Sequence, residues 1–63
     1  MRTEDVQVGM LVQVQRGSRE ADLRGRIGIV KQRFGNHSYT PFEVHFESNK
    51  QLELLWAVEF EEW

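Results

Sequence analysis

Nonpolar and polar side chains alternate along most of this 63-residue chain, and this alternation constrains the fold more than any other feature of the sequence. In the segment PFEVHFES, the nonpolar residues Phe42, Val44 and Phe46 are each separated by one polar residue. A β-strand directs successive side chains to opposite faces of a sheet, so this spacing predicts a strand with one face in a hydrophobic core. No segment repeats its nonpolar residues at the helical period of about 3.6. The sequence therefore predicts an all-β protein.

Four further segments either alternate in the same way or are rich in β-branched residues. Besides PFEVHFES, the expected strands are MLVQVQR, RIGIVKQRF, QLELLW and a short final strand near VEFEE. In the second of them, Lys31 and Arg33 are expected to point into solvent. The other residues expected to face the core are Met10, Val12, Val14, Leu52, Leu54, Trp56, Val58 and Phe60.

Residues typical of turns separate these strands. The long first connection, RGSREADLRG, is bounded by Gly17 and Gly25, and the next two connections are GNHSYTP and SNK. Only two or three residues, around Trp56 to Val58, separate the last two strands, so we expect a single 3₁₀ turn there. Five short strands in one domain spanning residues 1–63 favour a closed barrel, because an open sheet of this size leaves its edges exposed.

The first half of the chain carries a recognisable glycine pattern. The segment VGMLVQVQRG, a long loop and then LRGRIGIVKQRF resemble the KOW-type opening of SH3-like barrels. The segments FEVHFE, LELLW and VEFEEW look like the remaining strands, so the resemblance covers nearly the whole chain. It implies a single five-stranded SH3-like barrel. In such a barrel Gly9, Gly25 and Gly28 are expected where the backbone turns or approaches another strand closely.

Charge is unevenly distributed along the chain. Residues 16–33 contain six basic and two acidic side chains, for a net charge of +4, whereas residues 43–63 contain six acidic and one basic, for −5. A docking surface follows from this only if the fold keeps the basic side chains on one face. The candidate partner-binding residues are Arg16, Arg19, Arg24, Arg26, Lys31, Arg33 and Tyr39.

Two classes of partner fit these residues. KOW-type barrels occur in ribosomal and transcription-elongation proteins, and here the basic residues would contact phosphates while Tyr39 or Phe34 stacks on bases. The sequence pI of about 5.6, however, is far below that of typical nucleic-acid-binding domains. SH3-like barrels also occur as small subunits of larger complexes. We therefore favour an accessory or docking subunit that binds a protein through a basic hairpin face, with RNA or DNA binding as the alternative.

Three nonpolar residues lie outside the expected core. Leu11 and Leu55 fall on the strand faces opposite their core neighbours, and Trp63 falls opposite Phe60 in the final alternation. Leu11 and Leu55 either cap the open ends of the barrel or form a candidate apolar contact for a partner or for a second copy in a homodimer. Trp63 either folds back on the barrel or belongs to the same contact. In the final strand Glu59 and Glu61 are expected to point outward, and together with Glu62 they would protect a sheet edge from pairing.

Neither a catalytic nor a metal-binding signature is present. His37 and His45 have no cysteine partners and no neighbours in a triad-like order, so we expect a turn residue and a strand residue. One family of plasmid-borne dihydrofolate reductases is built from SH3-like barrels, but its cofactor-contacting Val-Gln-Ile-Tyr is replaced at residues 52–55 by Leu-Glu-Leu-Leu. We expect a non-catalytic protein without a cofactor. The absence of cysteine and of any nonpolar run of about 20 residues favours a cytoplasmic location.

Overall fold

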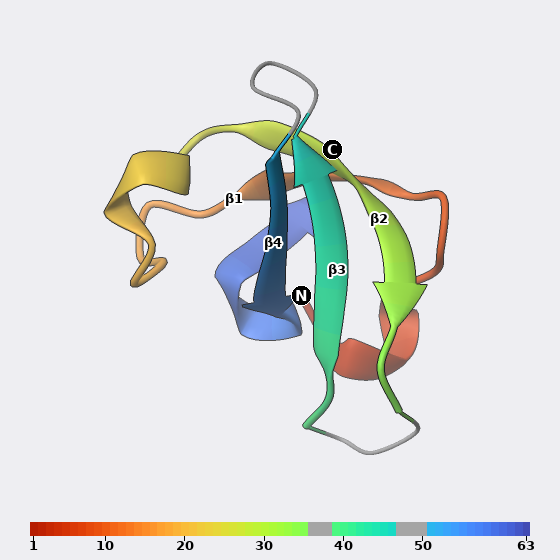
Figure 1. The fold of residues 1–63 in the computed structure, drawn as a ribbon. Helices are drawn as coiled ribbons and strands as arrows, with labels where there is room; N and C mark the ends of the chain where they lie inside the picture. The colour runs from red at the N-terminus through yellow and green to blue at the C-terminus, as the bar shows by residue number, and fades with distance from the viewer. Residues whose placement is uncertain (36–38, 47–50) are drawn as a thin grey trace.

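The computed structural model describes residues 1–35, 39–46 and 51–63 (Figure 1). The strands are β1 (Leu11–Val14), β2 (Ile27–Arg33), β3 (Pro41–Phe46), β4 (Gln51–Trp56) and β5 (Phe60–Glu62). Three single-turn 3₁₀ helices accompany them: η1 (Thr3–Asp5), η2 (Ala21–Leu23) and η3 (Ala57–Glu59). The described residues contain no α-helix, which confirms the all-β prediction. The predicted SNK turn, the middle of GNHSYTP and His37 lie outside the described residues.

All five strands belong to one antiparallel sheet in the order β4-β3-β2-β1-β5. Strand β2 connects its two halves, because its first residues pair with β1 and its later residues pair with β3. In Figure 1 this strand starts near η2, curves across the molecule and ends beside the start of β3. No ladder between the described residues joins β4 to β5, so the sheet is not closed. Closure into a barrel therefore stays a prediction.

The core lies on the concave side of this curved sheet. From the five strands it receives the buried side chains of Val12, Val14, Val30, Phe42, Val44, Phe46, Leu55 and Phe60. The rings of Phe42 and Phe60 meet edge to face, with their centroids 6.0 Å apart. These rings come from β3 and β5, which are not neighbours in the sheet, so their contact shows that the sheet bends around the core. An aromatic pair of this kind stabilises a fold by about 0.5–1.5 kcal/mol beyond the burial of its area.

Gly9, Gly25 and Gly28 lie where the backbone requires glycine, as the sequence predicted. A Cβ atom on Gly28 would lie 2.7 Å from Val44 Cγ1 and 2.9 Å from the backbone oxygen of His45, which is too close for any side chain. Gly9 and Gly25 have φ values of 95° and 80°, in the left-handed region that favours glycine. The close approach at Gly28 allows β3 to pack tightly against β2.

A β-bulge in β2 changes which way its last residues face. Val30 lies opposite Val44, but Gln32 lies opposite the very next residue of β3, Glu43, so Lys31 is the extra residue. Beyond the bulge Arg33 lies opposite the buried Phe42. The prediction that Arg33 points outward is therefore wrong: it is half-buried, and its guanidinium carbon lies 5.5 Å from the centre of the Phe42 ring.

The predicted orientation of β4 is also wrong. Leu55 lies opposite Phe42 and is fully buried, whereas Leu52 and Leu54 are 54% and 57% exposed. Trp56, expected in the core, is exposed as well. Because paired residues of antiparallel strands project to the same face, the register with β3 decides the orientation, and Leu55 cannot be an apolar contact for a partner.

The 3₁₀ turn expected before the last strand is confirmed as η3, but its residues face differently from the prediction. Val58, expected to face the core, is 72% exposed, and Glu59, expected in solvent, is buried. A 3₁₀ helix has about three residues per turn, so its side chains do not follow the alternation of a strand. Phe60 is buried, as predicted, where β5 begins, but both residues that follow it are exposed.

Candidate protein-docking site

The basic residues of the first hairpin are not gathered on one face. Arg24 and Arg26 precede β2, whereas Lys31 and Arg33 lie near its other end. A strand rises about 3.3 Å per residue, so the backbones of Arg26 and Lys31 lie about 16 Å apart. The bulge then separates Lys31, on the outer surface, from Arg33, which folds back toward Phe42.

Two of these arginines bind main-chain oxygens of the protein itself. Arg24 donates from Nε to the backbone oxygen of Ser18 at 2.7 Å. Arg33 donates from Nε to Gly35 O at 2.6 Å and from Nη1 to Thr3 O at 3.3 Å. These contacts give both guanidinium groups a structural role. Partner binding by these arginines stays a prediction, as it does for the exposed Arg16 and Lys31 and for the half-buried Arg26.

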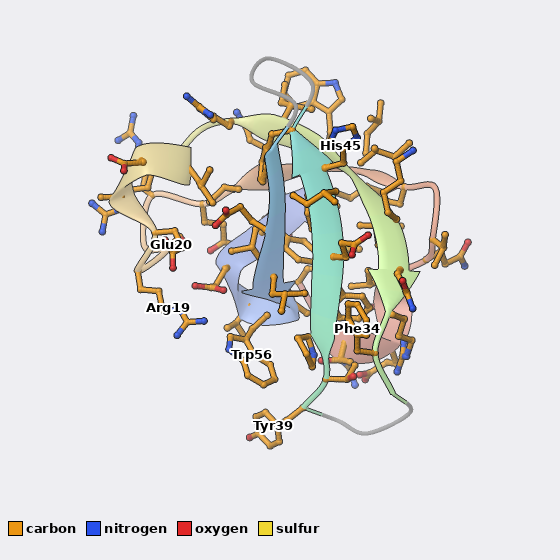
Figure 2. The ribbon with its side chains drawn as sticks, viewed as in Figure 1. Arg19, Glu20, Phe34, Tyr39, His45 and Trp56 are labelled. Atoms are coloured by element: carbon orange, nitrogen blue, oxygen red, sulfur yellow. The ribbon has the colours of Figure 1, made fainter. Side chains whose placement is uncertain are left out.

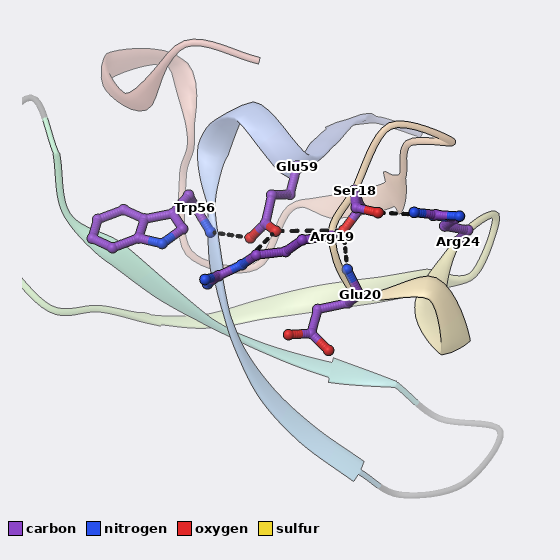
Figure 3. A network of polar contacts seen from close by, with 6 residues as sticks. All are labelled: Ser18, Arg19, Glu20, Arg24, Trp56 and Glu59. Atoms are coloured by element: carbon purple, nitrogen blue, oxygen red, sulfur yellow. Dashed lines mark hydrogen bonds and ion pairs between the residues drawn. The ribbon is translucent and has the colours of Figure 1, made fainter.

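Glu59 is the centre of a polar network that the sequence did not predict (Figure 3). Its carboxylate accepts hydrogen bonds from Ser18 Oγ at 3.4 Å, Arg19 Nε at 3.1 Å and the backbone N–H of Trp56 at 2.9 Å. These bonds join the long first connection to the end of β4. The spacing Trp-x-x-Glu is the one sequence signal, because a glutamate at the third helical position commonly bonds back to the N-cap residue.

Ser18 extends the network into the long first connection. Its hydroxyl accepts a hydrogen bond from the backbone N–H of Glu20 at 3.1 Å, and its backbone oxygen is the acceptor for Arg24. The Ser18 side chain is buried, so these partners satisfy a group that would otherwise cost free energy to bury. The network thereby holds the start of η2 and the end of β4 in a fixed relation.

A hollow with two aromatic side chains lies next to this network. Its volume is about 440 Å³, within the range typical of ligand sites. Figure 2 shows Tyr39 and Trp56 projecting at the same end of β3 and β4. The nonpolar lining of this aromatic groove comes from Met1, Tyr39, Trp56, Ala57 and Val58. Tyr39, a predicted binding residue, is 84% exposed and belongs to the groove, whereas Trp56 and Val58 were assigned to the core by the sequence and were missed.

The structure also explains how the groove residues are positioned. Trp56 lies opposite Pro41 at the end of β4, so its side chain emerges beside the segment that carries Tyr39. The hydrogen bond from Trp56 N–H to Glu59 starts the η3 turn, which buries Ala57 and projects Val58 outward.

The charges at the groove compensate each other. Arg2 Nη2 and Glu4 Oε1 form an ion pair at 2.6 Å, and both side chains are exposed and line the groove. A hydrogen bond from the main chain of Glu4 itself, followed by the nearby Arg2 guanidinium, holds the pKa of Glu4 below its ordinary value. Glu4 therefore stays ionised at neutral pH, and the side-chain charges of Arg2 and Glu4 compensate each other at the groove.

A second hollow, of about 370 Å³, lies on the outer surface of the sheet. It is lined by Leu11, Ile27, Gly28, Ile29, Lys31 and His45. Ile29 pairs with Leu11 on one side and with His45 on the other, so these three side chains form a row across β1, β2 and β3. Beyond Leu11, the backbone N–H of Trp63 donates to Leu11 O at 2.9 Å. Leu11 and Trp63 are exposed, as predicted, and their role in contacts stays a prediction.

Within residues 1–35, 39–46 and 51–63, no three His, Cys, Asp or Glu side chains are placed to hold a metal ion. In the same part of the chain, no helix has the length and apolar character needed to cross a membrane. Comparison of the chain with models of protein families, with curated proteins and with solved structures finds no match.

Proposed function

We propose that this protein is a non-catalytic binding module that holds an extended peptide segment of a protein partner in the aromatic groove. The observation that carries the proposal is the exposure of Tyr39, Trp56 and Val58 around a hollow of about 440 Å³. Large nonpolar and aromatic side chains gathered around a hollow are typical of interaction sites, and Trp and Tyr are enriched among residues that dominate binding energy.

A protein partner is favoured over nucleic acid by the placement of charge. Binding to a phosphate backbone requires several lysine or arginine side chains along one surface. Here the basic residues are dispersed, and Arg24 and Arg33 bind the protein's own backbone. The groove adds a single arginine, paired with Glu4, and the whole chain has a net charge of −2.

We also propose that the chain forms an SH3-like barrel of the KOW type. The support is the five-stranded antiparallel sheet, the order β4-β3-β2-β1-β5 and the 3₁₀ turn between the last two strands. On that basis we propose a small cytoplasmic accessory subunit, which takes its biological role from the complex that it joins.

The test is selection from a library of random short peptides displayed on phage. We expect enriched peptides to bind the wild-type protein and to perturb the NMR signals of Met1, Trp56 and Val58. Tyr39→Ala is expected to weaken that binding by about tenfold or more, as for a residue at the centre of an interface. Phe34→Ala is the matched control, because Phe34 is an exposed aromatic residue outside the groove, and it is expected to bind as the wild type does.

Titration with single- and double-stranded oligonucleotides tests the alternative. We expect no binding at physiological salt. Micromolar binding that falls steeply with salt, and that Arg16→Glu and Lys31→Glu abolish, would replace the peptide proposal by a nucleic-acid-binding one. Enriched peptides that bind Tyr39→Ala and the wild type equally would also reject the groove.

A further inference from the structure

The main-chain groups along the outer edge of β4 can be assigned from the hydrogen bonds at its end. Pro41 lies opposite Trp56, and Pro41 O accepts a bond from Phe34 N–H at 3.2 Å, so this oxygen points toward β2 and away from β4. Trp56 is therefore in a pair without mutual hydrogen bonds, and its own N–H donates in the other direction, to Glu59. The main chain of Trp56 faces the outer edge.

The alternation of an antiparallel ladder extends this assignment along the strand. Every second residue of a strand directs its N–H and C=O to the same side, so Leu54 and Leu52 also direct theirs to the outer edge. No strand of the described residues lies beyond that edge. The same two residues and Trp56 expose their side chains on the outer face of the sheet. The edge thus combines available hydrogen-bonding groups with a nonpolar surface, a combination that promotes pairing with another strand.

We propose that β4 pairs antiparallel with β4 of a second copy of this chain, about a two-fold axis that passes between the two Leu54 residues. In this register Leu54 lies opposite the partner's Leu54, and Leu52 lies opposite the partner's Trp56. All the exposed nonpolar side chains of the strand then meet another nonpolar side chain, and cross-strand pairs of this kind stabilise sheets. The spacing of Leu52 and Trp56, two residues on either side of Leu54, makes the strand self-complementary, as a two-fold interface requires.

Charge disfavours the register centred on Glu53. The two-fold axis is perpendicular to the sheet, so side chains that lie opposite each other project to the same face. The two neighbouring registers place this axis at Glu53 or at Leu55. An axis at Glu53 places two like-charged carboxylates opposite each other and leaves Trp56 outside the paired segment. An axis at Leu54 instead sets Glu53 opposite the partner's Leu55. The absence of opposed like charges and the nonpolar pairing therefore favour the same arrangement.

Hydrogen bonding gives the same answer. In the proposed register the Leu54 N–H groups donate to each other's carbonyl oxygens, and each Leu52 N–H donates to the partner's Trp56 O. The Trp56 N–H keeps its bond to Glu59, so the pair of Leu52 and Trp56 forms one of its two usual hydrogen bonds, whereas the central Leu54 pair forms both. An axis at Leu55 instead pairs Leu54 with the partner's Trp56, so each of these pairs contains a Trp56 N–H already bonded to Glu59 and neither has both of its bonds.

Disulfide trapping tests the axis directly, because the chain has no cysteine. A hydrogen-bonded antiparallel pair has Cα atoms about 5.5 Å apart, within the range that a disulfide spans. We expect Leu54→Cys to form a covalent dimer under mild oxidation much faster than Leu11→Cys. The second variant tests the other contact predicted for a second copy, and Leu11 has a similar exposure, 49% against 57%. Equal rates for the two variants, or a faster Leu11→Cys, would overturn the proposal.

Sedimentation velocity over a range of concentrations tests the dimer without oxidation. The wild type is expected to change from monomer to dimer as concentration rises, Leu54→Lys to stay monomeric, and Leu11→Lys to dimerise as the wild type does. Circular dichroism is expected to show the same fold for all three, because both leucines are exposed. A wild type that stays monomeric up to about 1 mM, or one that forms trimers or larger rings through β4 and β5, contradicts the proposal.

Discussion

The two edges of the sheet are built in opposite ways. At one edge β5 is three residues long, and its exposed side chains are Glu61 and Glu62. At the other, β4 is six residues long and exposes two leucines and a tryptophan on its outer face. Short length and charge are common means of preventing unwanted strand pairing. The difference indicates that one edge is closed to partners and that the other is available to them.

Further contacts within the chain hold β5 against β1. Gln15 donates from Nε2 to Glu61 Oε1 at 2.5 Å, and its backbone N–H donates to Glu59 O at 2.9 Å. These bonds attach β5 to the end of β1. A second strand approaching β5 would therefore meet glutamate side chains, one of them already fixed.

The largest expected effect on stability is the difference between substitutions on the two faces of β4. Leu55→Ala removes a fully buried side chain and is expected to lower the free energy of unfolding by about 2–5 kcal/mol. Leu54→Ala removes an exposed one and is expected to change it by no more than about 0.5 kcal/mol. Chemical denaturation in dilute, monomeric protein measures both. If Leu54→Ala were the more destabilising of the two, the assigned orientation of β4 would be wrong.

A smaller effect is expected where the long first connection meets the end of β4. Glu59→Ala leaves the Trp56 N–H and the Ser18 hydroxyl without their acceptor, which is expected to cost about 1–3 kcal/mol of unfolding free energy. Arg19→Ala is expected to cost less than about 1 kcal/mol, because the Arg19 side chain is largely exposed. Thermal or chemical denaturation distinguishes them.

The neighbouring Glu62→Ala is the matched control, because Glu62 is exposed in β5. It is expected to change the free energy of unfolding by no more than about 0.5 kcal/mol. Equal losses from Glu59→Ala and Glu62→Ala would mean that the buried carboxylate does not hold the turn.

The strands were predicted well from the sequence. Which side chains of a strand point into the core was predicted well only where one face of the strand is clearly polar. The alternation in β1 and β3 correctly identifies Val12, Val14 and Val44 as core residues. In β4 both faces carry leucine, so the pattern there cannot choose between them, and the choice depends on the register with β3. The bulge at Lys31 leaves no mark in the alternation that would reveal it.

The candidate site was predicted only in part for related reasons. Tyr39 follows a run of turn-forming residues, so its exposure could be expected. Trp56 and Val58 look like core residues by composition, and only the η3 turn brings them to the surface. Glu59 looks like a solvent residue in an acidic segment, and its burial depends on Ser18, which lies 41 residues away in the sequence.

The smallest expected effect concerns the protection of β5. Glu62→Val removes one charge from the short edge and is expected to leave the free energy of unfolding nearly unchanged. A slight increase in association with concentration is expected from light scattering, and Leu54→Lys in the same chain is not expected to remove it. Association that Leu54→Lys does abolish would mean that the added contact also passes through β4.

Amide hydrogen exchange at Leu54, followed as a function of protein concentration, tests the pairing of β4 most directly. The Glu53 N–H faces β3, so its protection depends on folding and is the internal reference. We predict that the Leu54 N–H exchanges rapidly in dilute protein and becomes protected as the concentration rises, while protection at Glu53 stays constant. Exchange at Leu54 that does not change with concentration would contradict the account.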